Sequence, residues 1–291
     1  MSWTLFRWTW RLESPLFVGL LPAGSLNRCR LCVPSRAVWG ALTAELARRR
    51  KGGFPIYKTE GAALQEKTRF TYMFPAECYE GRWRAWLPRY ELGHGLVWRR
   101  EDRHNDSHDL TDRQMRMRLV DARPATAIDP NSESAEDGSL RETECVLPSW
   151  RNEGSPVAFV GYVFLKQDLP ELRDLTDLFL GGDTRYGFGR VRRVGDWTSA
   201  SDIFRAQVDL NQAAPLVRSN RLLAHTHHGA GHAEIIGSQE LLAGWNRTRH
   251  DPFHPIAEMP LWTPGSRVRD GGVANWEIGE NGIWKFAGDF Q

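Results

Sequence analysis

The sequence has 291 residues, 41% of them hydrophobic and 25% charged, which leaves room for one large soluble domain or two smaller ones that share a core. The formal net charge is only +2, so the charge balance alone does not call for a nucleic-acid partner. No stretch approaches the ~18 consecutive apolar residues of a membrane span, and the N-terminus lacks the pattern of a signal peptide. We therefore expect a cytoplasmic protein without a membrane partner.

The tryptophan and arginine contents are unusual. The 13 tryptophans indicate either a tryptophan-rich core or aromatic surfaces for stacking. Most of the 38 basic residues are arginines, and they cluster in residues 82–90, 98–104, 112–118 and 185–193. A codon bias toward arginine explains the excess over lysine but not the clustering. Because arginine binds phosphate through a planar fork and stacks on bases, the clusters are candidates for nucleic-acid contacts.

The four cysteines do not form a metal-binding pattern. Cys29 and Cys32 make one CxxC pair, whereas Cys78 and Cys145 stand alone. A structural zinc site needs four ligands at short paired spacing, so we expect buried cysteines in a reducing compartment. The sequence indicates no metal site and no cofactor.

The N-terminal third predicts a strand, a loop and a helix. In residues 2–14, large apolar side chains alternate as on one face of a half-buried strand, at Trp3, Leu5, Trp8, Trp10 and Leu12. After a Pro/Gly loop, residues 33–53 change to a helical period, with Ser35 as the expected N-cap and basic residues in the last turn. Residues 67–92 then carry aromatic strand sequence.

The central segment, residues 99–145, is strongly polar and can contribute little to a core. Two short runs, at 118–129 and 139–146, flank the turn-rich residues between them, which predicts a long, exposed β-hairpin. Residues 155–166 predict a core strand.

The remaining chain predicts a helix, a glycine-rich loop and short strands. Leucines at helical spacing in residues 168–182 indicate a short amphipathic helix that ends at a glycine pair. A strand follows at 190–198, and beyond residue 205 the pattern breaks into short strand-like pieces. We expect two halves, 1–195 and 196–291.

The stretch "FLGGDTRYGFGRV", residues 179–191, has the composition of a phosphate-binding loop. It lacks the lysine of a nucleotide-binding P-loop. The dinucleotide fingerprint requires a strand before the glycines and a helix after them, whereas the order expected here is the reverse. The loop therefore indicates either a nucleic-acid backbone site, with Arg185 and Arg190 for phosphates and Tyr186 and Phe188 for stacking, or a tight structural connection.

At this point the sequence resembles a family. The loop "GGDTRYGFGRV" looks like the glycine-rich loop of the RAMP superfamily, the repeat-associated proteins of CRISPR systems. Residues 14–49 are similar to the end of the first strand, the following loop and the "Pro-Ser-x-x-x-x-Gly-Ala-Leu" start of the first helix in that family. Residues 123–146 resemble the segment that forms a thumb-like hairpin in backbone subunits of type III effectors. The three motifs occur in the family's order.

The resemblance implies an α+β, ferredoxin-like (RRM-like) fold with a long β-hairpin insertion at about 99–145. The C-terminal residues 196–291 would form a second, degenerate RRM-like half or an irregular cap. The implied function is to bind CRISPR RNA within a type III effector complex in antiviral defence. The implied partners are other RAMP subunits, the large subunit and, indirectly, target RNA.

The resemblance also implies an RNA-binding surface. In the segment after the first strand and at the helix start it includes Gly19, Ser25, Arg28, Ser35 and Arg36. In the glycine-rich loop it includes Gly181, Gly182, Arg185, Tyr186, Gly187, Phe188, Gly189 and Arg190. In the hairpin it includes Arg123, Thr126 and Asp129, with the hairpin inserted at the guide–target duplex.

Two departures from the family favour a non-catalytic subunit. Target-cleaving backbone subunits carry an aspartate in the loop after the first strand, whereas no acidic residue occurs here between Glu13 and Glu45. Metal-assisted RNA cleavage needs a carboxylate near the scissile phosphate. Guide-processing nucleases carry the glycine-rich loop near the C-terminus, but here about 100 residues follow it. The chain thus resembles either a subunit that caps the 5′ handle of the guide or a non-catalytic backbone subunit.

The alternative function is an endoribonuclease. Histidines gather at His225, His227, His228 and His232, and His227 or His228 with Glu234 would supply acid–base chemistry. Few carboxylates lie nearby, which favours a loop that contacts RNA or a neighbouring subunit. A second group, His104 and His108 with Asp102, Asp106 and Asp109, is typical of a solvated mixed-charge loop rather than a metal site.

Overall fold

The computed structural model describes residues 2–20, 23–50, 54–105, 107–227, 234–245, 253–255 and 259–289. Its largest sheet has ten strands in the order β13-β14-β1-β12-β4-β5-β6-β7, with β15 paired to β1 and β3 paired to β12. All of these pairings are antiparallel. The strands are β1 (Thr4–Leu12), β3 (Thr68–Phe70), β4 (Phe74–Tyr79), β5 (Arg82–Glu91), β6 (Gly95–Arg100), β7 (Leu110–Thr111), β12 (Ala158–Leu165), β13 (Asp177–Phe179), β14 (Arg190–Arg193) and β15 (Thr198–Ser199).

The two predicted core strands lie side by side at the centre of this sheet. The predicted strand at β1 is present, and Trp8, Trp10 and Leu12 are buried with the expected alternation of one face. Leu5 is also buried, but its odd position places it on the other face, so the predicted single face is wrong for Leu5. Every residue of β12 is buried, as expected for a strand covered on both faces. Trp8 stacks on Phe70 of β3 at 5.8 Å between ring centroids, so part of the tryptophan content serves the core.

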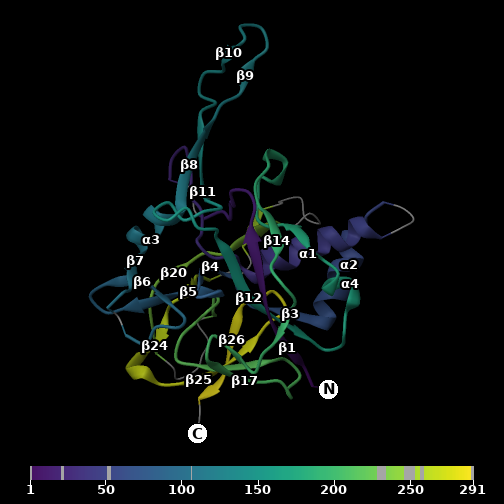
Figure 1. Ribbon diagram of the computed structural model, residues 1–291, viewed down its shortest axis with the longest axis vertical. Helices are drawn as coiled ribbons and strands as arrows, with labels where there is room; N and C mark the ends of the chain where they lie inside the picture. Colours follow the sequence, from purple (N-terminus) through teal and green to yellow (C-terminus); the bar gives the residue numbers. More distant parts are fainter. Residues whose placement is uncertain are drawn as a thin grey trace.

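The helices are few, so the fold is α+β with mostly antiparallel sheets. They are α1 (Ser35–Arg49), α2 (Tyr57–Lys67), α3 (Asp112–Leu119) and α4 (Pro170–Arg173). In Figure 1, α1, α2 and α4 gather on one side, whereas α3 lies on the other side near β7. The predicted N-cap of the first helix is wrong by one residue: Pro34 is the N-cap, and Ser35 is the first helical residue, buried without a capping bond.

The helix predicted over 168–182 is wrong. Only the single turn of α4 forms, and residues 177–179 instead form β13, which pairs with β14. The leucines that suggested a helical stripe, Leu172, Leu175, Leu178 and Leu180, are all buried. A turn followed by a short strand has placed them in the core, which periodicity over so few residues cannot distinguish from a helix.

A long two-stranded ribbon projects from the body (Figure 1). It contains β8 (Val120–Ala125) and β11 (Arg141–Val146), which pair antiparallel, and carries β9 (Ile128–Asp129) and β10 (Ser134–Ala135) nearer its tip. We call residues 120–146 the hairpin. The predicted pairing of the two runs is thus present over a narrower span than 99–145. Residues 99–119 belong to the body, where Met115 and Leu119 are buried and Arg99 is paired with Asp109.

The chain after residue 200 forms a five-stranded antiparallel sheet and three small strand pairs. The larger sheet contains β16 (Asp202–Ile203), β17 (Ala206–Asp209), β18 (Leu216–Ser219), β25 (Ala274–Ile278) and β26 (Trp284–Asp289). The pairs are β19 (Ile235–Ile236) with β24 (Arg267–Val268), β20 (Gln239–Glu240) with β23 (Leu261–Trp262), and β21 (Ala243–Trp245) with β22 (Phe253–Pro255). One hydrophobic cluster runs from Trp8 and Phe74 through Trp276 and Trp284, so both predicted halves share a core.

Candidate nucleic-acid interface

The three motifs singled out in the sequence meet at one end of the main sheet. The segment that follows β1 lies between the other two: Leu16 forms a β-bridge with Val146 of the hairpin, and Phe17 forms one with Gly182 of the glycine-rich loop. Farther along the same segment, β2 (Leu26–Asn27) pairs in parallel with β11. The sequence predicts each motif separately, and the structure joins them through these backbone contacts.

The glycine-rich loop, residues 180–189, joins β13 to β14 and contains a single 3₁₀ turn at Thr184–Tyr186. The predicted order of helix, glycines and strand is therefore replaced by strand, glycines and strand. Two glycines are required by close packing. A Cβ on Gly181 would lie 2.1 Å from the carbonyl oxygen of Phe17, and one on Gly189 would lie 2.0 Å from that of Leu180. Both also have positive φ, which glycine adopts without strain.

Several backbone amides of this loop donate hydrogen bonds inside the protein. The N–H of Gly182 donates to the Phe17 carbonyl at 2.8 Å, and the N–H of Gly189 donates to the Pro15 carbonyl at 2.7 Å. The N–H groups of Tyr186 and Gly187 close the 3₁₀ turn. These four amides are therefore not available to a phosphate, and an anion at the loop would contact other amides or the side chains.

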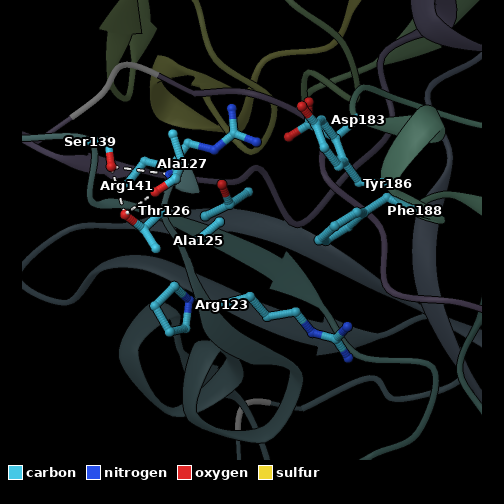
Figure 2. Close-up of a pocket in the computed structure, with 11 residues that line it drawn as sticks. Arg123, Ala125, Thr126, Ala127, Ser139, Arg141, Asp183, Tyr186 and Phe188 are labelled. Atoms are coloured by element: carbon cyan, nitrogen blue, oxygen red, sulfur yellow. Dashed lines mark hydrogen bonds between the residues drawn. The ribbon is translucent and has the colours of Figure 1, made fainter. Parts of the chain in front are cut away.

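Those side chains face the base of the hairpin across a groove of about 460 Å³. On one side, β8, β11 and the residues beyond them contribute Arg123, Thr126, Ser139 and Arg141; on the other, the glycine-rich loop contributes Asp183, Tyr186 and Phe188. Figure 2 shows the two sets on opposite sides, with both arginine side chains extending toward the loop. We call this the hairpin–loop groove.

Each arginine of the hairpin lies over an aromatic ring of the loop. The guanidinium carbon of Arg141 is 5.0 Å from the ring centre of Tyr186, and that of Arg123 is 5.8 Å from the ring centre of Phe188. A hydrogen bond with Tyr186, together with the nearby charge of Asp183, raises the pKa of Arg141 above its usual range. Tyr186 is 67% exposed, whereas Phe188 is buried, so Tyr186 offers the open ring face of the pair.

The two loop arginines predicted to bind phosphate differ in their surroundings. Arg185 is exposed, and among the described residues no carboxylate forms an ion pair with it. Arg190 is also exposed, but its guanidinium lies 3.3 Å from Asp177. The charge of Arg185 is therefore more available to a phosphate than that of Arg190.

The hairpin residues Thr126 and Asp129 stabilise the hairpin itself. The hydroxyl of Thr126 lies 2.6 Å from that of Ser139 on the opposite strand. Asp129 accepts hydrogen bonds from the N–H of Asn131 and the hydroxyl of Ser132, and these bonds lower the pKa of its carboxyl group. This is the geometry of an Asx turn, so Asp129 shapes the tip.

The other predicted RNA-binding residues differ in how far they are exposed to solvent. Gly19 and Ser25 are exposed in the segment beside the hairpin, and Ser25 accepts a hydrogen bond from the N–H of Glu142. Arg28 is half-buried in the same segment. Ser35 is buried against Gly282, where a Cβ on the glycine would lie 2.1 Å from the serine Cβ, so its hydroxyl does not reach the groove. Burial lowers the pKa of Arg36, which is half-buried at the start of α1.

Arg141 is the residue that sequence reasoning missed. It pairs with Ala125, and Arg123 pairs with Thr143, so the two arginines lie on the same face of the hairpin at a spacing of two residues. The sequence shows both arginines, but only the strand register shows that they share a face.

Only part of the histidine group lies within the described residues. His225 is fully buried, whereas His227 is half-buried and its N–H donates to the Trp284 carbonyl. The carboxylate of Glu234 is paired with Arg269 at 2.5 Å. His228 and His232 lie outside the described residues, as does Asp106 of the second histidine group.

The described residues contain no group of three or more His, Cys, Asp or Glu side chains placed to hold a metal ion. In the second histidine group, Asp102 and Asp109 instead pair with Arg100 and Arg99. None of the described helices is long and apolar enough to cross a membrane.

Solved structures share this fold, although no protein-family model and no curated protein sequence matches the chain. One is a chain of the type III-B Cmr-beta bound to cognate target RNA and AMPPnP, with a TM-score of 0.57 and 10% identity over 90% of this chain and 85% of the other. Another is a chain of the type III-B Cmr-beta bound to cognate target RNA, with a TM-score of 0.53 and 11% identity over 90% and 86%. The chain therefore has the fold of a subunit found in type III-B assemblies.

Proposed function

We propose that this chain, which has the fold of a type III-B subunit, is a non-catalytic RNA-binding subunit of a type III RNA-guided effector complex. Its partners would be CRISPR RNA, neighbouring subunits of the complex and, through the guide, target RNA. The observation that carries the proposal is the hairpin–loop groove, in which two arginines and an exposed tyrosine converge from segments far apart in the sequence.

The strand order supports a ferredoxin-like arrangement. In that arrangement four antiparallel strands run in the spatial order 4-1-3-2, with helices after the first and third strands. Here β14, β1, β12 and β4 are neighbours in that order, α1 follows β1, and α4 follows β12. The hairpin lies between the second and third of these strands in sequence. This supports its interpretation as an insertion into an RRM-like core.

The groove has the chemistry needed to hold an RNA backbone without reading its sequence. Guanidinium groups bind phosphates and stack on aromatic rings, and Tyr186 offers an exposed ring on which a splayed base can stack. Since both interactions tolerate any base, binding would depend weakly on guide sequence. Positions at the 5′ handle and in the backbone of the complex are both compatible with such a groove.

The hairpin would contact the guide–target duplex with its distal part. Two of its side chains, Ile128 and Leu140, are apolar yet 63% and 60% exposed. Apolar side chains inserted between base steps unstack nucleic acid and kink it. Hydrogen bonds between Thr126 and Ser139 and, at the tip, between Ser132 and Asp129 hold this projection in one shape.

The carboxylates near the groove support binding rather than cleavage. Asp129 is engaged in its turn, Asp177 is paired with Arg190 and Arg192, and Glu13 is paired with Arg11. After Glu13, the segment that follows β1 contains no further acidic residue before Glu45, so no second carboxylate of this segment lies beside a phosphate in the groove. Asp183 lines the groove as a single carboxylate and contributes to the charge environment of Arg141.

Measurement of RNA binding by the purified chain tests the proposal. We expect Arg123→Ala with Arg141→Ala to weaken binding of a labelled single-stranded RNA by at least about tenfold, because charge-assisted hydrogen bonds contribute about 1.5–3 kcal/mol each. The slope of log K against log salt should become shallower by about 0.7 per lost phosphate contact. Fluorescence anisotropy over a salt series gives both quantities.

The matched control is Arg48→Ala with Arg82→Ala, which removes two exposed arginines that do not line the groove. This variant should bind RNA with wild-type affinity and nearly the wild-type salt slope. Equal losses in the two double variants would show that binding follows overall charge and would contradict the groove assignment.

A further inference from the structure

A second pocket, of about 290 Å³, lies between β5 and the C-terminal sheet and is lined by arginines. Arg89 comes from β5, Arg205 from the turn between β16 and β17, and Arg218 and Arg221 from the end of β18 and the residues after it. Pro88, Phe204 and Leu223 supply an apolar wall. It shares no lining residue with the hairpin–loop groove. Its strand β17 lies toward the end of the molecule opposite to the hairpin (Figure 1).

The positive charge of this arginine pocket is only partly balanced. Within the described part of the chain, no carboxylate forms an ion pair with Arg89, Arg205 or Arg221. The nearby Asp109 is engaged by Arg99 through two hydrogen bonds of 2.6 and 2.5 Å. Glu91 acts on Arg89 and Arg221 only through its charge.

The arginines in and beside this pocket repel one another electrostatically. Burial, with the charges of Arg221 and Arg99, lowers the pKa of Arg89 to about 10. Burial also lowers the pKa of Arg221, and the charges of Arg99 and Arg267 act in the same direction. The Nε atoms of Arg89 and Arg267 are buried without a hydrogen-bond partner in the described structure. An anion in the pocket would relieve this repulsion.

The two-residue turn that carries Arg205 has a strained backbone, because two non-glycine residues in it have positive φ. Phe204 and Arg205 have φ of 48° and 72°, in the left-handed region that two-residue hairpin turns normally fill with Asn and Gly. Phe204 is held in the core, where its ring contacts Tyr162 edge-on at 4.9 Å. Arg205 is thereby directed outward, with its guanidinium 3.2 Å from the ring of His104. Strained backbone of this kind concentrates at binding sites.

We propose that the arginine pocket binds the phosphate group of a nucleotide. Guanidinium forks match phosphate oxygens, and a phosphate monoester carries about −1.5 to −2 charges, which suits several converging arginines better than the single charge of a carboxylate. A volume of about 290 Å³ lies at the lower end of ligand pockets, so it fits one nucleotide unit. The source is a free mononucleotide or a phosphate of an RNA strand.

Thermal unfolding of the purified chain with added probes tests this proposal. We expect AMP, or a 5′-phosphorylated RNA trinucleotide too short to fill both sites, to raise the midpoint of wild-type unfolding saturably at constant ionic strength. Stabilisation by AMP identifies a free nucleotide, and stabilisation by the trinucleotide alone identifies a strand. Either supports the pocket when it is lost in Arg205→Asn and Arg221→Gln but kept in Arg123→Ala with Arg141→Ala, which changes only the hairpin–loop groove. The opposite pattern overturns the pocket assignment. Failure of both probes to stabilise the wild type overturns it.

Two variants separate binding from folding. Arg205→Asn places a residue that tolerates positive φ at the strained turn, so the ligand-free chain should be at least as stable as wild type, yet its apparent affinity should fall by about tenfold or more. Arg221→Gln relieves repulsion in the free protein and should show the same loss of affinity. The control Arg82→Gln changes an exposed arginine at the other end of β5 and should respond as wild type does. A wild-type response in both pocket variants would overturn the assignment.

Discussion

At the scale of single residues, glycines of the loop serve packing, whereas we propose that its side chains bind RNA. Gly181 and Gly189 allow the chain to pass against carbonyl oxygens of Phe17 and Leu180, positions where any Cβ would overlap. Gly187 also has positive φ, but nothing lies within 4 Å of the position of its missing Cβ. Close packing and positive φ both require glycine at positions 181 and 189, whereas only the positive φ favours glycine at position 187.

These reasons predict different costs for substitution. We expect Gly189→Ala to lower the free energy of unfolding by about 2–5 kcal/mol, the sum of left-handed backbone strain and steric overlap. Gly187→Ala should cost only about 1–2 kcal/mol, because only the strain applies. Chemical denaturation measures both, and an equal loss in the two variants would show that close packing is not what Gly189 provides.

At the scale of elements, the sequence predicted the helices and strands whose hydrophobic pattern is long or is flanked by turn residues. The strand at β1, the helix at α1, the buried strand at β12 and the pairing of β8 with β11 all follow from alternation, helical period or turn residues. The helix at 168–182 failed because four buried leucines within nine residues fit a turn and strand as well as a helix.

The candidate site was predicted only in part, for a related reason. Composition identified Tyr186 and Arg185, and the resemblance supplied Arg123, but neither could give the register that places Arg141 beside them. Long-range backbone contacts, such as that between Phe17 and Gly182, also occupy amides that the glycine-rich sequence had suggested for phosphate binding. Pairing over such separations is fixed by tertiary packing, which local pattern does not encode.

At the scale of the whole molecule, a buried polar network joins the two predicted halves. The hydroxyl of Tyr72, before β4, lies 2.6 Å from Nδ1 of His225, and Nε2 of His225 lies 2.5 Å from a carboxylate oxygen of Glu240. Glu240 also binds Arg30 from the segment after β2. One hydrophobic core and one polar network therefore span both predicted halves.

Because this network contains two groups that titrate in acid, we expect the free energy of unfolding to decrease in mild acid. Burial lowers the pKa of His225, so the unfolded state takes up a proton first as the pH falls, and stability is lost below the unfolded value of about 6.5. Burial opposes the ionisation of Glu240, but bonds and charges from His225 and Arg30 lower the pKa of its carboxyl group, so it adds a loss in the same direction at lower pH. The free energy of unfolding should therefore decrease from pH 7 to pH 5.

Two variants identify the group responsible. His225→Gln should make the slope of unfolding free energy against pH shallower in that window, because the titrating imidazole is gone. Tyr72→Phe should lower stability by about 1–3 kcal/mol through the unpaired Nδ1 while it keeps the slope. A wild-type slope in His225→Gln would rule out this histidine as the source.

We propose that RNA lies in the hairpin–loop groove, and photochemical crosslinking of a bound single-stranded RNA, with the crosslinked residues identified by mass spectrometry, can locate it. Aromatic rings that stack on bases are the side chains placed to crosslink, so we expect a dominant crosslink at Tyr186 and others in residues 123–141 of the hairpin. In the Arg123→Ala with Arg141→Ala variant these crosslinks should disappear together. Crosslinks spread evenly over the surface, with Tyr186 unmodified, would mean that RNA does not lie in this groove.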